Sequence, residues 1–261
     1  MNPGLRTSAS GMRAQQLMVD TIANNLANVN TTGFKRSRVS FEDVLYETLE
    51  QPRTVNPNDS QTIAPVQIGK GVRLGAITRL HTQGAPEQTG RTLDVAIQGD
   101  GFFQVEKPDG TTAYTRDGSF GVSDTGAIVT NDGYRVLPNV TLPQDVQDVS
   151  ISPSGLVQAN NGSGQPVELG RIELARFVNP SGLMSLGENL YAETAASGQP
   201  VTGFPQELGF GKLMQGYLES SNVEIVQEMT DMIAAQRAYE INAKAIRAGE
   251  DMMQATNDLI R

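Results

Sequence analysis

The sequence predicts an α+β protein with a long helix at each end and an antiparallel β-rich domain between them. Apolar residues recur every seven positions near both ends, turn pairs such as Asp-Gly recur through the middle, and Pro- and Gly-rich stretches separate the two patterns. We therefore expect a coiled-coil-like terminal domain from residues 1–45 and 216–261, a central β domain over 93–190, and extended connecting arms over 46–92 and 191–215.

The N-terminal helix is expected to run from about Thr7 to Val29 and to end near Asn30. Gly33 suits the left-handed position after a helix, and Phe34 suits the hydrophobic contact that accompanies it. Two apolar rows form a coiled-coil-like seam, which is weak at its start because Ser8 and Gln15 interrupt it. The rows consist of Leu5, Met12, Val19 and Leu26, and of Ile22 and Val29.

The C-terminal helix has a more regular seam. Ser221 and Glu224 fit the N-cap and third helical positions of a capping box, which predicts a helix over 222–260. Such a helix is about 58 Å long at 1.5 Å per residue and requires a long partner. Its main row, spaced by seven, is Ile225, Met232, Tyr239, Ile246, Met253 and Ile260, with Met229 on the adjoining row and Ile233 beside it.

The middle of the chain predicts short antiparallel strands. Turn pairs come at 100–101, 109–110, 117–118, 125–126 and 132–133, and the runs at 94–98 and 102–105 alternate apolar and polar residues. Prolines in 50–92, and glycines and prolines in 192–215, predict irregular arms that neighbouring subunits could hold in place.

The composition excludes several classes of function. A net charge of −9 opposes nucleic-acid binding, and the basic cluster at 35–38 is too small to change this. The absence of Cys excludes disulfides and thiolate chemistry. The first 20 residues lack the apolar core of a signal peptide, and no stretch is long and apolar enough to insert into a membrane.

Catalysis is not expected, and neither are a metal site nor a cofactor. The one histidine, His81, lies in a Pro- and Gly-rich arm, where a solvated residue is the simpler interpretation. The stretches 69–71 and 209–212 do not fit a phosphate-binding loop, and the Asp-Gly turns lack the spacing of a calcium loop.

Asn24, Asn25, Asn28 and Asn30 crowd the end of the first helix, although asparagine is a poor helix former. Their amides could satisfy a fraying last turn, or they could form hydrogen bonds across subunit contacts.

Four motifs carry a family resemblance. Residues 23–35 (ANNLANVNTTGFK), 93–103 (LDVAIQGDGFF), 114–120 (YTRDGSF) and the run from Ser221 to Asn242 resemble motifs of the bacterial flagellar rod, hook and hook-associated family, in the same order. The segment 33–52 and the arm after it are most similar to the distal rod branch.

The resemblance implies a structural subunit of the distal rod, which polymerises into a rigid helical drive shaft in the basal body. The implied partners are the protein itself as a helical homopolymer, the proximal rod proteins, the hook protein, the surrounding ring (bushing) proteins and the flagellar export apparatus. The chain would then be exported without a cleaved signal peptide to a rod that spans the periplasm. The alternatives are another axial protein of the family, a β-rich fibre protein, or a hydrolase with an unfamiliar site.

The seam residues and asparagines are therefore the expected subunit interface. This set comprises Leu5, Met12, Val19, Ile22, Asn24, Asn25, Leu26, Asn28, Val29, Ile225, Met229, Met232, Ile233, Tyr239, Ile246, Met253 and Ile260.

Overall fold

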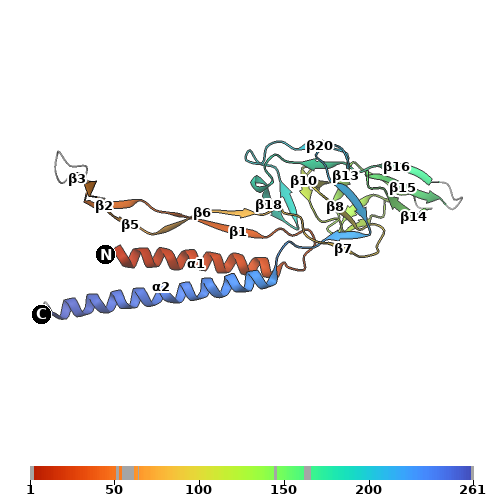
Figure 1. The fold of residues 1–261 in the computed structure, drawn as a ribbon. Helices are drawn as coiled ribbons and strands as arrows, with labels where there is room; N and C mark the ends of the chain where they lie inside the picture. The colour runs from red at the N-terminus through yellow and green to blue at the C-terminus, as the bar shows by residue number, and fades with distance from the viewer. Residues whose placement is uncertain are drawn as a thin grey trace. The chain divides into compact units, whose positions relative to one another are not determined.

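The computed structural model describes residues 3–50, 53–54, 62–63, 65–143, 146–161 and 166–259. The chain forms two compact units. Unit 1 contains Met1–Leu26, Ser37–Thr78 and Ile225–Arg261, and unit 2 contains Ala27–Arg36 and Arg79–Glu224. The predicted α+β class, with terminal helices and a central antiparallel β region, is confirmed (Figure 1).

Unit 1 is built from two long helices and a two-stranded ribbon. The helices are α1 (Pro3–Ala27) and α2 (Ile225–Leu259). The ribbon strands are β1 (Ser37–Asp43), β2 (Tyr46–Glu50), β3 (Arg53–Thr54), β4 (Thr62–Ile63), β5 (Val66–Gly69) and β6 (Val72–Arg79).

The helices α1 and α2 lie side by side and run antiparallel (Figure 1). Asn25 contacts Glu228 near one end of the pair, and Leu5 lies against Gly249 near the other. A Cβ atom on Gly11, between them, would come within 3.1 Å of the Asn242 amide, so the backbones approach closely there. Each helix thus supplies the long partner that the other requires.

The ribbon forms by nested strand pairs, β1 with β6, β2 with β5, and β3 with β4. It packs along α1, where the Val72 amide donates to Ser10 Oγ at 3.2 Å and Gly71 approaches Ser10 and Thr7. The expectation of an irregular arm over 46–92 is therefore wrong for the described residues. Val66, Gln67 and Ile68 alternate β-branched and polar residues, and Val72, Ile77 and Thr78 are β-branched, so these segments favour strands despite the scattered prolines.

Unit 2 is the β domain. A nine-stranded sheet has the order β11-β12-β13-β9-β10-β19-β18, with β17 pairing β9 and β20. The sheet strands are β9 (Phe102–Glu106), β10 (Thr112–Thr115), β11 (Phe120–Val122), β12 (Ile128–Thr130), β13 (Arg135–Leu137), β17 (Leu174–Arg176), β18 (Met184–Gly187), β19 (Leu190–Ala192) and β20 (Val201–Gly203).

Smaller sheets complete unit 2. The strands β14, β15 and β16 form a three-stranded sheet, while β8 pairs with β21 and β7 pairs with β22. Their bounds, with a short 3-10 turn η1, are β7 (Pro86–Gln88), β8 (Val95–Gln98), β14 (Val146–Ile151), β15 (Leu156–Asn161), β16 (Pro166–Arg171), η1 (Pro180–Gly182), β21 (Lys212–Gln215) and β22 (Tyr217–Glu219). Residues 191–215, also expected to be an arm, thus contribute strands to this unit.

The core of unit 2 gathers the inward side chains of these strands. Val95, Ile97, Phe103, Val105 and Leu174 are completely buried in one cluster. This burial explains how a chain with few aromatic residues still forms a packed β domain.

Two details of the expected helix ends are wrong. The C-terminal helix begins at Ile225, because Asn222 is held in an extended segment by hydrogen bonds to the Arg36 amide and the Leu80 carbonyl. Ser221 therefore does not cap it, and its Oγ accepts from the Val223 amide instead. Gly33 has the expected positive φ of 67°, but it lies beyond the end of α1 at Ala27 and donates its N–H to the Glu219 carbonyl.

Candidate assembly interface

The N-terminal half of α2 carries an exposed apolar face, which we call the α2 apolar face. Met229 is 52% exposed and Ile233 is 50% exposed. The face consists of Ile225, Val226, Met229, Ile233 and Tyr239. Val226 was missed by the sequence reasoning because it lies off the seven-residue row. Exposed apolar side chains that gather on one helix face mark an interaction surface.

A different row of α2 packs against α1. Glu228, Ala235 and Gly249 are buried, and half-buried Asn242 lies between the last two at the same spacing of seven. These small and polar residues let the two helices approach closely. The regular apolar row, Ile225 to Met253, is consequently displaced to the flank of the helix pair, where its members stay half-buried or exposed.

Asn25 is buried inside unit 1. Its amide Nδ2 donates to the Ser37 carbonyl at 2.9 Å and to Glu228 Oε2 at 3.1 Å, and its Oδ1 accepts from the Ser37 amide at 2.8 Å. The side chain joins α1, α2 and the start of the ribbon. Its hydrogen bonds therefore serve the fold of the subunit.

The other expected interface residues fall into three groups. Ile22 is buried, and Asn24 and Met253 are exposed. Asn28 is half-buried just after α1, and its Oδ1 accepts from Thr31 Oγ1 at 3.2 Å. Leu5, Met12, Val19, Leu26, Val29, Met232 and Ile246 are half-buried, and Ile260 lies outside the described residues.

The ribbon adds apolar surface that the sequence reasoning missed. Leu45 is 83% exposed, and Tyr46, Leu49, Val66 and Ile68 are exposed beside it. A two-stranded ribbon is only marginally stable in water without a covered face. The alternation of Val66, Gln67 and Ile68 is the signal that could have identified β5.

A buried ionic cluster joins three distant segments of unit 2, and we call it the junction cluster. Lys35 Nζ pairs with Glu219 and donates to the Thr82 carbonyl at 2.7 Å. Arg116 Nη1 contacts the second Glu219 oxygen at 3.3 Å, and the Gly84 amide donates to the first at 2.9 Å. Burial lowers the pKa of Lys35, while the Glu219 carboxylate opposes that shift. One carboxylate thus pairs with two buried cations.

Asn222 completes the junction cluster. Its Oδ1 accepts from the Arg36 amide at 2.7 Å, and its Nδ2 donates to the Leu80 carbonyl and to Thr82 Oγ1, each at 2.8 Å. The segments 33–36, 80–84 and 219–222 are therefore connected by side-chain bonds as well as by backbone bonds. Residues of the N- and C-terminal motifs meet here, inside one subunit.

His81 packs beside the junction cluster, so the expectation of a solvated histidine is wrong. Its ring lies edge-on to Phe102 and Tyr191 at 5.5 and 5.3 Å between centroids. Burial, together with the positive charges of Lys35, Arg116 and Arg79, lowers the pKa of His81 to about 4. The imidazole is neutral at pH 7 and acts as a packing group.

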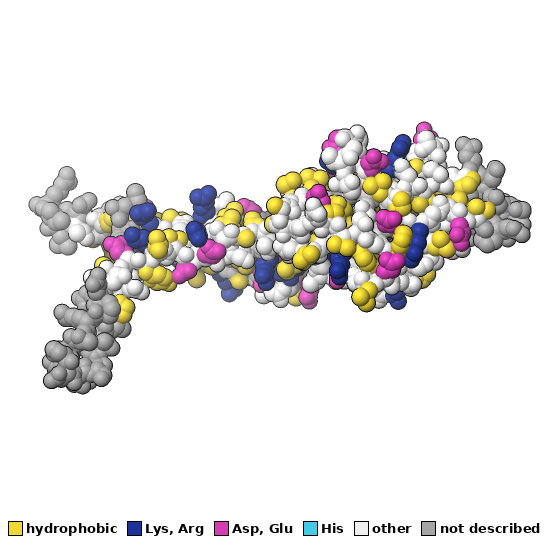
Figure 2. Space-filling model, turned by 90° about the horizontal axis from the view of Figure 1, so that it is seen from above, with side chains coloured by type: hydrophobic (Ala, Val, Ile, Leu, Met, Phe, Trp, Pro, Cys, Tyr) yellow, Lys and Arg dark blue, Asp and Glu magenta, His cyan; other side chains and the backbone are white. Residues whose placement is uncertain are grey.

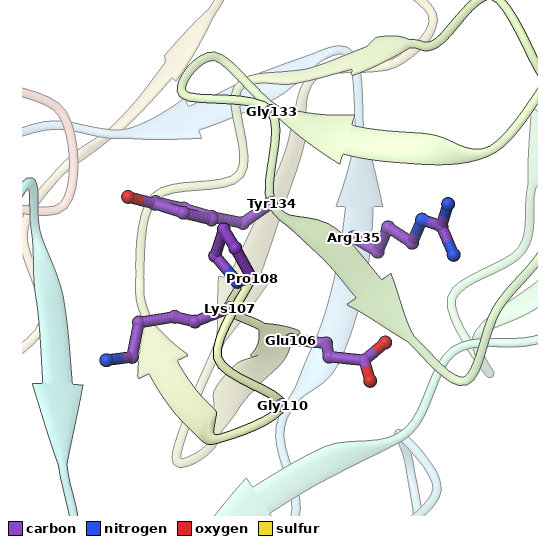
Figure 3. Close-up of a pocket in the computed structure, with 7 residues that line it drawn as sticks. All are labelled: Glu106, Lys107, Pro108, Gly110, Gly133, Tyr134 and Arg135. Carbon is purple, nitrogen blue, oxygen red and sulfur yellow. The ribbon is translucent and has the colours of Figure 1, made fainter.

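One surface pocket of unit 2 is lined by side chains that do not converge on a common point (Figure 3). In the pocket of Figure 3, the Lys107 and Tyr134 side chains point to one side while Glu106 and Arg135 point to the other. Within the described residues, no three His, Asp or Glu side chains are grouped to hold a metal ion. Over the same residues, neither helix is apolar enough to cross a membrane.

Charged side chains of both signs are interspersed on the face seen in Figure 2, and hydrophobic side chains remain at the surface between them. Such a mixed surface suits association through many apolar contacts with local charge matching.

Three protein families match parts of the chain. Residues 5–35 match "Flagella basal body rod protein", 96–159 match "Flagellar hook protein FlgE/F/G D1 domain", and 214–259 match "Flagellar basal body rod FlgEFG protein C-terminal". These ranges overlap all four motifs that carried the resemblance.

Full-length relatives agree with these matches. The chain is 50% identical over 257 residues to the flagellar basal-body rod protein FlgG of Caulobacter vibrioides, covering 98% of each chain. It is 49% identical to the protein of that name from Borreliella burgdorferi, with both chains fully covered. It is 46% identical to that of Buchnera aphidicola, over 99% of this chain and 100% of the relative. The predicted family resemblance is confirmed, and the chain belongs to the FlgG family of flagellar basal-body rod proteins.

Proposed function

We propose that this chain is a structural subunit of the distal flagellar rod and that it polymerises through unit 1 into a rigid helical shaft. The observation that carries the proposal is the α2 apolar face, which remains uncovered in the single subunit. Burial of apolar surface drives most protein association, and about 25 cal/mol is gained for each Å² removed from water. A repeated contact between unlike surfaces that does not close generates a filament.

The terminal helical segments, 1–45 and 216–261, are the proposed polymerisation domain. Met229, Ile233 and Tyr239 would contact helices of neighbouring subunits, while Asn25 and Glu228 hold the helix pair together within each subunit. The ribbon would contribute a second contact through Leu45 and its exposed neighbours. The chain would act without catalysis or a cofactor.

The proposed partners follow from a position within a flagellar axis. Neighbouring copies would make most contacts, with proximal rod proteins at one end and the hook protein at the other. The ring (bushing) proteins would surround the shaft, and the export apparatus would deliver the subunits.

The test is a charge placed on the α2 apolar face. Ile233→Asp should abolish filament formation by the purified protein, because burying an unpaired carboxylate at a contact is costly. Its circular dichroism should match the unchanged protein, since Ile233 is already half-exposed. Val122→Asp is the matched control, because Val122 is 48% exposed in the β domain. Electron microscopy gives the readout, and normal filaments from Ile233→Asp would contradict the proposal.

Removal of the ribbon tests the second contact. Deleting residues 46–65 should leave subunits that assemble into flexible or irregular rods, because the ribbon loses β2 to β4 with exposed Tyr46 and Leu49. Straight rods of unchanged stiffness from this variant would show that the ribbon plays no part in assembly.

A further inference from the structure

Among the described residues, the C-terminal end of α2 extends past the start of α1. Leu5 lies against Gly249, and α1 begins at Pro3, so residues 250–259 of α2 extend beyond the start of α1 (Figure 1). This extension is about 15 Å long at 1.5 Å per residue. We call it the α2 overhang.

The α2 overhang is acidic and carries flexible apolar side chains. It contains Glu250, Asp251 and Asp258 and no Lys or Arg. Met252 is 63% exposed and Met253 is 40% exposed. Methionine is unbranched and polarisable, so it fills irregular apolar grooves well.

Unit 1 also contains a groove of matching chemistry between α1 and β6. Its floor is mainly aliphatic, and two arginines stand at its rim. Arg13 is exposed, and Arg73 is exposed and pairs with Glu42 through its Nη2 at 2.9 Å. The groove is lined by Ala9, Arg13, Leu17, Val72, Arg73 and Leu74.

The overhang cannot occupy the groove of its own subunit. In the antiparallel pair, Arg13 lies near the level of Asn242, because Gly11 contacts Asn242 directly. Met252 is ten residues further along α2, which places it about 15 Å from that level. Only a second copy of the chain can bring an overhang to this groove.

We propose that the α2 overhang of one subunit docks in the α1–β6 groove of the next, with Met252 and Met253 on its aliphatic lining and Glu250, three residues before Met253 on the same side of the helix, beside Arg13. The inference rests on the proposed polymerisation and specifies one of its contacts. Overhang and groove are different surfaces of one chain, so the contact is head-to-tail and continues without closing. The opposite charges of overhang and groove set the direction in which the overhang lies in the groove, and they favour one register of the contact.

Disulfide trapping tests the contact directly, because the natural chain contains no Cys. Met252→Cys and Leu74→Cys proteins are mixed, assembled and oxidised, and the linked peptides are identified by mass spectrometry. A disulfide requires Cα atoms within about 7 Å, so a link between the cysteines introduced at positions 252 and 74 reports docking. Val122→Cys, on the β domain, replaces Leu74→Cys as the matched control. We expect the 252–74 link to exceed the control link at least tenfold.

A charge exchange supplies the second test. Arg13→Glu should raise the protein concentration needed for assembly about tenfold or more, because close interfacial charge pairs are strongly coupled. Combining it with Glu250→Arg should restore most of the loss. Arg135→Glu, an exposed charge change on the β domain, should have little effect.

The outcomes separate this contact from the proposed function. If the unchanged chain forms no filaments, polymerisation itself fails. If it forms filaments but shows no 252–74 link and no rescue, the overhang contact is wrong while the proposed function stands. A 252–252 link in place of 252–74 would mean that overhangs pair with each other, and trapping of Leu49→Cys with Leu74→Cys would mean that the ribbon fills the groove. Either result would overturn the inference.

Discussion

Lys35 and Glu219 form a buried ion pair although 184 residues separate them in the sequence. Both side chains are almost completely removed from solvent, and Glu219 also contacts Arg116 and the Gly84 amide. Buried charges are stable only when their hydrogen bonds are complete. The pair therefore fixes the segment after α1, the segment after the ribbon and the segment before α2 in one arrangement.

Removing the carboxylate of this cluster should be strongly destabilising. Glu219→Gln removes the carboxylate that both Lys35 and Arg116 contact, and we expect a loss of about 3–5 kcal/mol in the free energy of unfolding. Lys35→Met should cost less, because Glu219 keeps Arg116 and Gly84 as partners. Urea unfolding followed by near-UV circular dichroism measures both.

The control for this comparison is an exposed ion pair. Lys70 contacts Glu47 at 3.4 Å on the ribbon, and both side chains are more than half exposed. Lys70→Met should change stability by less than about 1 kcal/mol. A loss for Glu219→Gln no larger than that of Lys70→Met would mean that the buried cluster contributes little.

His81 should make stability depend on pH. Its pKa is about 4 in the folded chain against an ordinary value of 6.5, so the unfolded chain binds the proton first as the pH falls. The stability contribution is complete above pH 6.5, decreases as the pH falls toward 4, and changes no further below that. The total loss is about 3 kcal/mol at 1.36 kcal/mol per pKa unit.

The His81→Gln variant isolates this effect, because His81 is the one histidine of the chain. Carboxylates also titrate near pH 4, but they contribute equally to both proteins. The difference between the two stability–pH curves should therefore fall within the window from 6.5 to 4. Parallel curves would show that His81 is not held neutral, and NMR titration of the single imidazole gives its pKa directly.

Gly84 should tolerate no side chain. A Cβ atom there would overlap the Ser220 carbonyl oxygen, which is rigid backbone. Gly84→Ala should destabilise unit 2 by about 1–3 kcal/mol through overpacking. Gly121→Ala is the control, because nothing lies within 4 Å of its added Cβ and the substitution reduces the freedom of the unfolded chain. Thermal unfolding should show that Gly84→Ala lowers the melting temperature, whereas Gly121→Ala leaves it unchanged or raises it. Equal changes of melting temperature in the two variants would exclude the predicted overlap.

Asn25 should matter for the fold of unit 1 before any assembly. Asn25→Ala removes three hydrogen bonds and leaves Ser37 and buried Glu228 with fewer partners, so we expect a loss of about 2–4 kcal/mol. Gln16→Ala, at an exposed position of α1, should be nearly neutral. Trypsin digestion of the monomer checks this, with faster cleavage of α1 expected in Asn25→Ala only. Equal cleavage rates in the two variants would mean that Asn25 does not stabilise unit 1, and a role in subunit contacts would then be favoured.

The sequence by itself determined the kinds of element and their order. Seven-residue spacing from Ile225 to Met253 identified a long helix, and the regular turn pairs identified short antiparallel strands, because both patterns reflect local backbone periodicity. The motifs around Asn25 and Asn222 identified the family. The positive φ of Gly33 was also predicted locally, since few residues other than glycine adopt that conformation.

Only the tertiary structure decided which partners these residues meet. The regular apolar row of α2 lies at the flank of the helix pair, since the row with Ala235 and Gly249 packs against α1 instead. Asn222, in a segment that looked like a helix start, bonds instead to Arg36 and Leu80, and those long-range bonds outweigh a local cap. Periodicity places side chains on a face, but the packing of distant segments decides what that face contacts.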